Sequence, residues 1–226
     1  MNAPRIDWVV LTTGDRPVEL ARALNSLAGG LAAEDRVHLV LNGPDLDPPA
    51  ASSLAADVAA ALHVIHAGEN LGIPGGRNLG AGIGSAGVER AATVEAVQNS
   101  AVEGGADVIA FLDDDAVVVG AGALCADLRA RFGSDQRLGG VSFRIVDPTT
   151  GATAQRHVPR PGGAGLDREG PVTSFLGGAS ALSGPMFRQV GGYEAAFFYA
   201  HEESDLAWRA IGQGWSFVYA PSLVVT

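Results

Sequence analysis

Three consecutive carboxylates, Asp113, Asp114 and Asp115, have the most evident chemistry of any residues in this chain. They follow the apolar run 108–112 and precede the apolar residues 116–119, a pattern typical of a buried parallel strand with acids at its C-terminal end. Adjacent carboxylates repel one another at low dielectric, so a bound cation would stabilise the cluster. The pattern predicts a site for Mg²⁺ or Mn²⁺, which prefer carboxylate ligands and leave positions for substrate phosphates. A solvated acidic turn is the alternative.

A second candidate site lies in residues 70–78, where three glycines and a proline stand between a strand and a helical segment. Backbone without Cβ atoms allows a ligand to approach closely, and amides at a helix start favour anionic oxygens. A plain loop with a helix cap is the alternative. Both candidate sites follow the C-terminal ends of predicted parallel strands, where open α/β sheets bind ligands.

The elements that must position these residues alternate between strands and helices. Strands are predicted at 6–13, 37–41, 62–66, 108–112, 141–146, 172–176, 181–183, 216–220 and 223–226, and helices at 17–27, 52–62, 88–103, 121–132, 185–190 and 202–213. This alternation predicts an α/β fold of three layers, α/β/α, with a central, mostly parallel sheet covered on both faces. Residues 148–171 lack periodicity and predict a mobile loop, long enough for a lid or a substrate-specific insertion.

Composition restricts the partners. The chain of 226 residues fits one large domain, and its 15 arginines, with no lysine, against 25 acids give a net charge of 15 − 25 = −10. Such a surface argues against nucleic acid or an anionic membrane as the main partner. The single cysteine, Cys125, excludes an internal disulfide and is expected to be buried and inert. The start of the chain lacks a signal-peptide pattern, and no integral membrane segment is predicted, so we expect a cytoplasmic protein able to meet a lipid-linked substrate peripherally at a membrane.

Two other motifs suggest different functions. Residues 82–87 match G-x-G-x-x-G, but a dinucleotide site should follow the first strand, so a flexible interruption is the better interpretation. The acids also resemble the first motif of haloacid-dehalogenase-type phosphatases, with Asp113 as nucleophile, Asp115 as general acid/base, and Val117. That family usually relies on a lysine and carries the motif near the start of its fold, whereas this chain has no lysine and places the acids mid-chain. The phosphatase stays as an alternative hypothesis.

Taken in order along the chain, the motifs resemble those of family 2 glycosyltransferases with the GT-A fold, over about residues 6–226. The matching segments are Thr12-Thr13-Gly14-Asp15-Arg16; Asn42 after the second strand; Asn70-x-Gly72-x-x-x-Gly76-Arg77-Asn78; Asp113-Asp114-Asp115 as the D-D-D variant of the D-x-D metal motif; Gly177-Gly178-Ala179-Ser180 through to Tyr193; and Glu202-Glu203-Ser204-Asp205-Leu206-Ala207-Trp208-Arg209, similar to E-D-x-D-L-x-x-R.

The resemblance implies a single GT-A domain over residues 1–226, with a nucleotide-binding part over about 1–119 and an acceptor-side part over about 120–226. It implies an inverting, metal-assisted transfer from a nucleoside-diphosphate sugar to a hydroxyl of a sugar, lipid-linked or small-molecule acceptor. The implied metal ligands are Asp115 and Asp113. The implied donor-binding residues are Thr12, Gly14, Arg16, Asn42, Asn70, Gly72, Gly76, Arg77, Asn78, Asp113 and Asp114, and the implied acceptor-side residues are Gly177, Gly178, Ala179 and Glu202.

The catalytic base implied by position is Glu203, where the family usually has aspartate. Asp205 is the alternative base, and Glu202 is expected to stabilise the start of the helix that it begins. A solvated acidic helix start, or an idle module that only binds nucleotide sugars, would explain the same residues. In related enzymes a histidine just beyond the terminal strand often adds a metal ligand. None of the five histidines lies at that position, so we expect the site either to be empty of metal or to hold the metal through Asp115, nucleotide oxygens and water alone.

Overall fold

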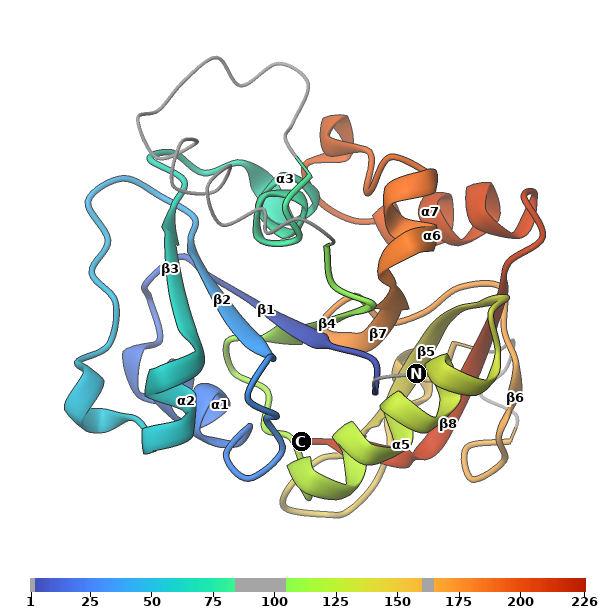
Figure 1. Cartoon of the computed structure of the whole chain (residues 1–226), viewed down its shortest axis with the longest axis horizontal. Helices are drawn as coiled ribbons and strands as arrows, with labels where there is room; N and C mark the ends of the chain where they lie inside the picture. Colours follow the sequence, from blue (N-terminus) through green and yellow to red (C-terminus); the bar gives the residue numbers. More distant parts are fainter. Residues whose placement is uncertain (1–2, 84–104, 160–164) are drawn as a thin grey trace.

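The computed structural model describes residues 3–83, 105–159 and 165–226. Within these ranges, eight strands form one sheet in the order β3-β2-β1-β4-β7-β5-β8-β6 (Figure 1). Four of its seven neighbouring pairs are parallel (β2 with β3, β1 with β2, β1 with β4, β5 with β8), so the predicted mostly parallel sheet is confirmed. The predicted helix at 88–103 and residues 84–87 of the glycine motif at 82–87 lie outside the described residues.

Apolar runs form the strands, as their burial on both faces requires. The strands are β1 (Ile6–Thr12), β2 (Arg36–Leu41), β3 (Leu62–His66), β4 (Val108–Asp113), β5 (Leu138–Ile145), β6 (Gly170–Pro171), β7 (Ala179–Ser183) and β8 (Ser216–Val225). The helices are α1 (Pro17–Asn25), α2 (Ala56–Ala61), α3 (Gly72–Gly80), α5 (Ala121–Ser134), α6 (Gly184–Gln189) and α7 (Glu202–Ile211), with 3₁₀ turns η1 (Ala51–Ser53), η2 (Gln155–His157) and η4 (Ala195–Phe197). Among the described helices, none is long and apolar enough to cross a membrane.

Two apolar cores separate three layers. On one face of the sheet α1, α2 and α5 pack around Trp8, Leu24 and Leu128, and on the other face α3, α6 and α7 pack around Val9, Phe111 and Leu206. Figure 1 shows these two sets of helices on opposite sides of the sheet. The predicted three-layer α/β/α architecture is therefore confirmed.

Four local predictions differ from the structure. The predicted helix at 52–62 is divided into η1 and α2, because the two residues between them, Leu54 and Ala55, are extended. The glycines of segment 70–78 lie inside α3 rather than in a loop before a helix. Residues 172–176 are not a strand: the ladder with β8 covers only Gly170–Pro171, the Val172 amide adds one further bond to the Phe217 carbonyl, and the Leu176 amide donates to the side-chain hydroxyl of Ser142 rather than to a backbone carbonyl. The predicted strands 216–220 and 223–226 are one strand, β8, whose register against β5 shifts near Pro221, which has no N–H to donate.

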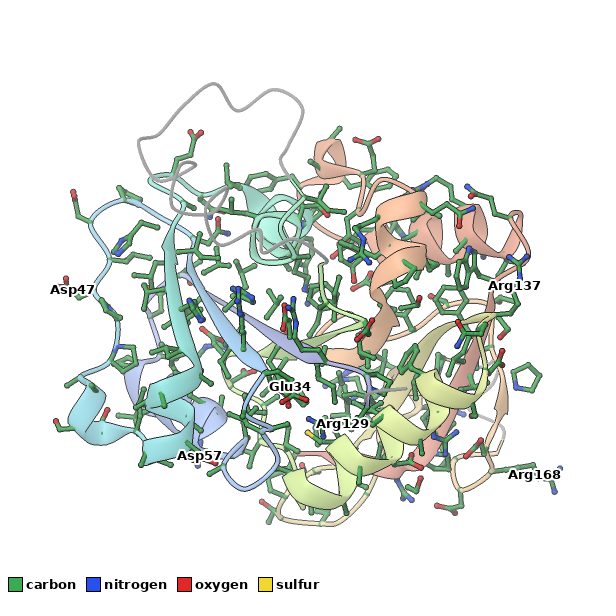
Figure 2. The ribbon with its side chains drawn as sticks, in the orientation of Figure 1. Glu34, Asp47, Asp57, Arg129, Arg137 and Arg168 are labelled. Carbon is green, nitrogen blue, oxygen red and sulfur yellow. The ribbon has the colours of Figure 1, made fainter. Side chains whose placement is uncertain are left out.

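The buried carboxylate of Asp35, at the start of β2, joins three elements. It accepts hydrogen bonds from the amides of Ile6, at 2.9 Å, and Ala32, at 2.8 Å. It also pairs with Arg129, which Figure 2 shows on α5.

Asp35→Ala should lower the free energy of unfolding by about 3 kcal/mol, because it leaves a guanidinium and two amides without their partner. Urea unfolding measures the change. Asp47→Ala is the matched control, since Asp47 is exposed and lies at the outer edge of the molecule in Figure 2; it should change stability by less than about 0.5 kcal/mol. Equal losses in the two variants would contradict a structural role for Asp35.

Candidate functional site

A cleft of about 540 Å³ opens where β1, β2 and β4 end. Parallel strands bring their last residues to one edge of a sheet, so segments far apart in sequence meet there. The lining residues are Leu11, Thr12, Thr13, Asp15, Arg16, Asn42, Asn70, Gly72, Ile73, Arg77, Asp113, Asp114, Asp115, Phe198 and Tyr199. Most of the predicted donor-binding residues are thus brought together, whereas Gly14, Gly76 and Asn78 do not line this cleft.

The three acids have different surroundings. Asp113 is the last residue of β4, and the other two lie in the turn that follows. Asp114 accepts a 2.6 Å hydrogen bond from the Thr12 hydroxyl, and burial raises its pKa although that hydrogen bond opposes the shift. Asp115 is half-exposed and pairs with Arg16. Asp114 therefore fastens the turn to β1, while Asp113 and Asp115 present carboxylates to the cleft.

Arg77 on α3 is the buried centre of an ionic cluster. Its guanidinium lies 3.1 Å from the Asp113 carboxylate and 3.4 Å from that of Glu203, with 7% of the side chain exposed. Glu202 follows at 3.6 Å. Burial lowers the pKa of Arg77, but the carboxylates, Asp113 first, outweigh it and the net pKa lies above its ordinary value. Arg77 stays charged and joins β4 to the start of α7.

The glycines predicted on the acceptor side make room for this cluster. A Cβ on Gly177 would lie 2.1 Å from both Arg77 Nη1 and Glu203 Oε1, and one on Gly178 would lie 1.9 Å from the Asp113 carboxylate. The Gly178 carbonyl also accepts the Asp113 amide at 3.1 Å. Ala179 follows as the first, buried residue of β7. These glycines allow charged side chains to pack directly on the backbone.

The first amides of α3 are already bonded within the protein. The Leu71 amide donates to Asn42 and the Gly72 amide to Asn70, both at 2.9 Å. The Ile73 amide donates to the Phe198 carbonyl, also at 2.9 Å. The expectation that these amides bind an anion is therefore wrong for the described conformation.

Several predicted site residues hold the framework in place. Both side-chain polar atoms of Asn78 bond to the backbone of Tyr193, at 2.8 and 2.9 Å. A Cβ on Gly76 would lie 2.4 Å from Leu11, so this glycine lets α3 pack closely on β1. Gly14 has φ of +84°, a conformation suited to glycine in the turn after β1. Contact of these three residues with a donor stays a prediction.

The three acids at the start of α7, Glu202, Glu203 and Asp205, have different partners. Glu203 faces Arg77, whereas Asp205 pairs with Arg209 at 2.8 Å, and Arg209 in turn donates to the Val190 carbonyl. Glu202 is buried, and among the described residues its Oε2 has no hydrogen-bond partner. Burial, and then the charge of Glu203, raise the pKa of Glu202. Glu203 and Asp205 are thus each paired with an arginine, at 3.4 Å and 2.8 Å, and which of them is a base stays a prediction.

Phe198 and Tyr199 line the cleft but were missed in the sequence. Three consecutive aromatic residues, 197–199, directly before the acidic motif are the signal that could have indicated them. Their role was hidden because they come from the acceptor-side part of the chain and reach the donor-side cleft only through folding.

A metal ion would need ligands from a bound substrate. Across the three described ranges, no group of three or more His, Cys, Asp or Glu side chains could hold a metal. The carboxylates of Asp113 and Asp115 nevertheless supply the hard oxygens that Mg²⁺ and Mn²⁺ prefer. They fit a metal that is completed by phosphate oxygens and water.

Comparison with solved structures shows the fold. The chain is similar to the mannosyltransferase PcManGT from Pyrobaculum calidifontis in complex with GDP-Man and Mn²⁺, with a TM-score of 0.61 at 14% identity over 100% of this chain and 57% of that one. It is similar to GalNAc-T7 with UDP, GalNAc and Mn²⁺, with a TM-score of 0.66 at 14% identity over 99% and 44%. For residues 1–349 of TarS from S. aureus the TM-score is 0.58 at 14% identity over 96% and 60%.

The chain therefore has the GT-A fold of these glycosyltransferases, and it spans about half the length of the chains that it matches. No family model matches the sequence. No curated protein matches it either.

Gly178→Ala should displace the Asp113 carboxylate from Arg77 and lower the free energy of unfolding by about 1–3 kcal/mol, as overpacking does. Denaturant unfolding measures the loss. Gly212→Ala is the control, because its new Cβ would meet Trp208 at 3.4 Å, an ordinary contact. If Gly178→Ala is as stable as the control, the packing of the acid on this glycine is not required.

Proposed function

We propose that the protein is a metal-assisted glycosyltransferase that moves a sugar from a nucleoside-diphosphate sugar to an acceptor hydroxyl. The observation that carries this proposal is the cluster in which Arg77 joins Asp113 to Glu203 beside one cleft of a GT-A fold. In this proposal Asp113 would help to hold a metal diphosphate, and Glu203, on the same guanidinium, would deprotonate a hydroxyl.

At the donor end, Asp115 and Asp113 would hold a divalent metal together with diphosphate oxygens. The metal, when bound, neutralises charge that develops on the leaving diphosphate. Arg16 pairs with Asp115 and lies 3.6 Å from Asp114, so the cleft also offers a cation next to the acids. The complexes of PcManGT with GDP-Man and Mn²⁺ and of GalNAc-T7 with UDP and Mn²⁺ support a donor and a metal of this kind.

At the acceptor end, Glu203 would take the proton of the attacking hydroxyl. Both acids pair with an arginine, but the Asp205–Arg209 hydrogen bond, at 2.8 Å, is shorter than the 3.4 Å contact between Glu203 and Arg77, and Arg209 also donates to the Val190 carbonyl after α6; we therefore assign the base to Glu203. Transfer by a single displacement, with inversion, needs no covalent enzyme intermediate, and the proposed site uses one base and no nucleophile from the protein.

The finer assignments rest on the order of the motifs. We assign the enzyme to family 2, with hexosyl transfer to a sugar, lipid-linked or small-molecule acceptor in the cytoplasm. The net charge of −10 disfavours nucleic acid as acceptor. A haloacid-dehalogenase-type phosphatase gains no support, because the acids follow the fourth strand along the chain of a GT-A fold rather than its first.

Asp115→Ala should abolish Mn²⁺-dependent binding of nucleoside diphosphates, because it removes a carboxylate that would hold the metal. Isothermal calorimetry with UDP, GDP and dTDP in Mn²⁺ measures the affinity, with Asp47→Ala as the control. An unchanged affinity in Asp115→Ala would contradict the metal role.

Glu203→Gln should leave donor binding nearly intact and cut transfer by about 100-fold or more, the scale expected for a lost general base. Asp205→Asn serves as the comparison, because it should act on stability through Arg209. If both variants fold, and Glu203→Gln lowers the transfer rate only slightly while Asp205→Asn lowers it strongly, Asp205 is the base.

A further inference from the structure

Three consecutive aromatic side chains are exposed just before α7. Phe197, Phe198 and Tyr199 expose 42%, 53% and 73% of their surface. The second and third of them line the cleft that contains the acids. Large rings kept in contact with solvent inside a ligand-sized cleft are typical of a surface that a ligand covers.

The backbone of this segment is held in an unfavourable conformation. Phe198, Ala200 and His201 have φ of +58°, +67° and +70°, a region that residues other than glycine seldom adopt. Such outliers persist only where surrounding contacts enforce them, and they cluster at functional sites. One contact that holds this segment is the hydrogen bond that the Phe198 carbonyl accepts from the Ile73 amide at 2.9 Å.

Gly72 makes that contact possible. It has φ of +71°, and a Cβ on it would lie 2.4 Å from the Phe198 carbonyl oxygen and 2.7 Å from the Phe198 ring. The aromatic segment is therefore seated directly on the start of α3. The same helix start is bonded to Asn42, the residue that follows β2. The rings consequently lie at the β2 end of the cleft.

The distance across the cleft suits a nucleotide. From the acids at the end of β4, the cleft crosses β1 and reaches the end of β2. Two strand spacings amount to roughly 10 Å. A nucleoside diphosphate whose phosphates meet the acids would extend its base over about this distance, toward Phe198 and Tyr199.

One polar side chain at this end, that of Asn42, is already engaged. Asn42 is 3% exposed, its Oδ1 accepts the Leu71 amide, and its Nδ2 donates to Asn70 and to the Gly72 carbonyl. An amide engaged in this way has little capacity left to read the edge of a base. Phe198 and Tyr199 keep 53% and 73% of their surface exposed, and an aromatic ring can stack on any nucleobase.

We propose that Phe198 and Tyr199 form the wall on which the nucleobase of the donor stacks. The inference rests on the proposed function, since it concerns the same donor. It assigns a donor-binding task to a segment that directly precedes the proposed base, Glu203, so one stretch of chain contacts the nucleotide and carries the catalytic carboxylate.

Calorimetry on the full chain with Mn²⁺ tests the proposal, with UDP, GDP and inorganic pyrophosphate as probes. Phe198→Leu and Tyr199→Leu keep apolar bulk and remove the ring. Each should weaken UDP and GDP about 10-fold or more, the scale of a lost base stack, and leave pyrophosphate within about 2-fold. Phe197→Leu is the matched control, because Phe197 does not line the cleft, and it should bind all three probes as the unaltered chain does.

The outcomes separate the two proposals. If the unaltered chain binds the nucleotides and both leucine variants bind them equally well, the stacking wall is refuted and the proposed function stands. If the variants lose pyrophosphate as strongly as nucleotide, the aromatic segment shapes the whole cleft and the stacking role is refuted. If the unaltered chain binds no probe in Mn²⁺, the proposed function fails, and the inference with it. Melting temperatures of all variants establish that they are folded.

Discussion

The rest of the site depends on the burial of one guanidinium, that of Arg77, among the carboxylates of Asp113, Glu202 and Glu203. A buried charge is costly unless it is paired and hydrogen-bonded, so Arg77 requires these acids to come together. The acids in turn would repel one another without it. This mutual dependence holds the end of β4 against the start of α7, and it places the proposed metal ligands beside the proposed base.

The ion cluster around Arg77 can form only because glycines lie beside it. Gly177 and Gly178 let the Arg77–Glu203 pair and the Asp113 carboxylate rest on bare backbone, and Gly72 does the same for the Phe198 carbonyl. The glycines of the acceptor-side segment and of α3 therefore serve packing between elements.

The layers and most elements follow from the sequence, because apolar runs such as 108–112 can be satisfied only as buried strands. The acids at the end of β4 were predictable for the same reason. The ion cluster was not, since Arg77 lies 36 residues from Asp113 and 126 from Glu203, separations that no local pattern records. The sequence also did not predict that the glycines in 70–78 are helical, because tertiary packing of α3 on β1 overrides their low helix propensity. Phe198 and Tyr199 could be recognised only once folding brought them to the cleft.

The central claim is that the acids at the end of β4 hold a metal diphosphate in the cleft beside Glu203. Anomalous scattering from Mn²⁺ in crystals grown with a nucleoside diphosphate tests it most directly. The account predicts one anomalous peak within ligand distance of Asp115 and of the diphosphate oxygens, in the cleft that Phe198 and Tyr199 line. A nucleotide bound away from these acids, or a Mn²⁺ peak remote from Asp113 and Asp115, would contradict it.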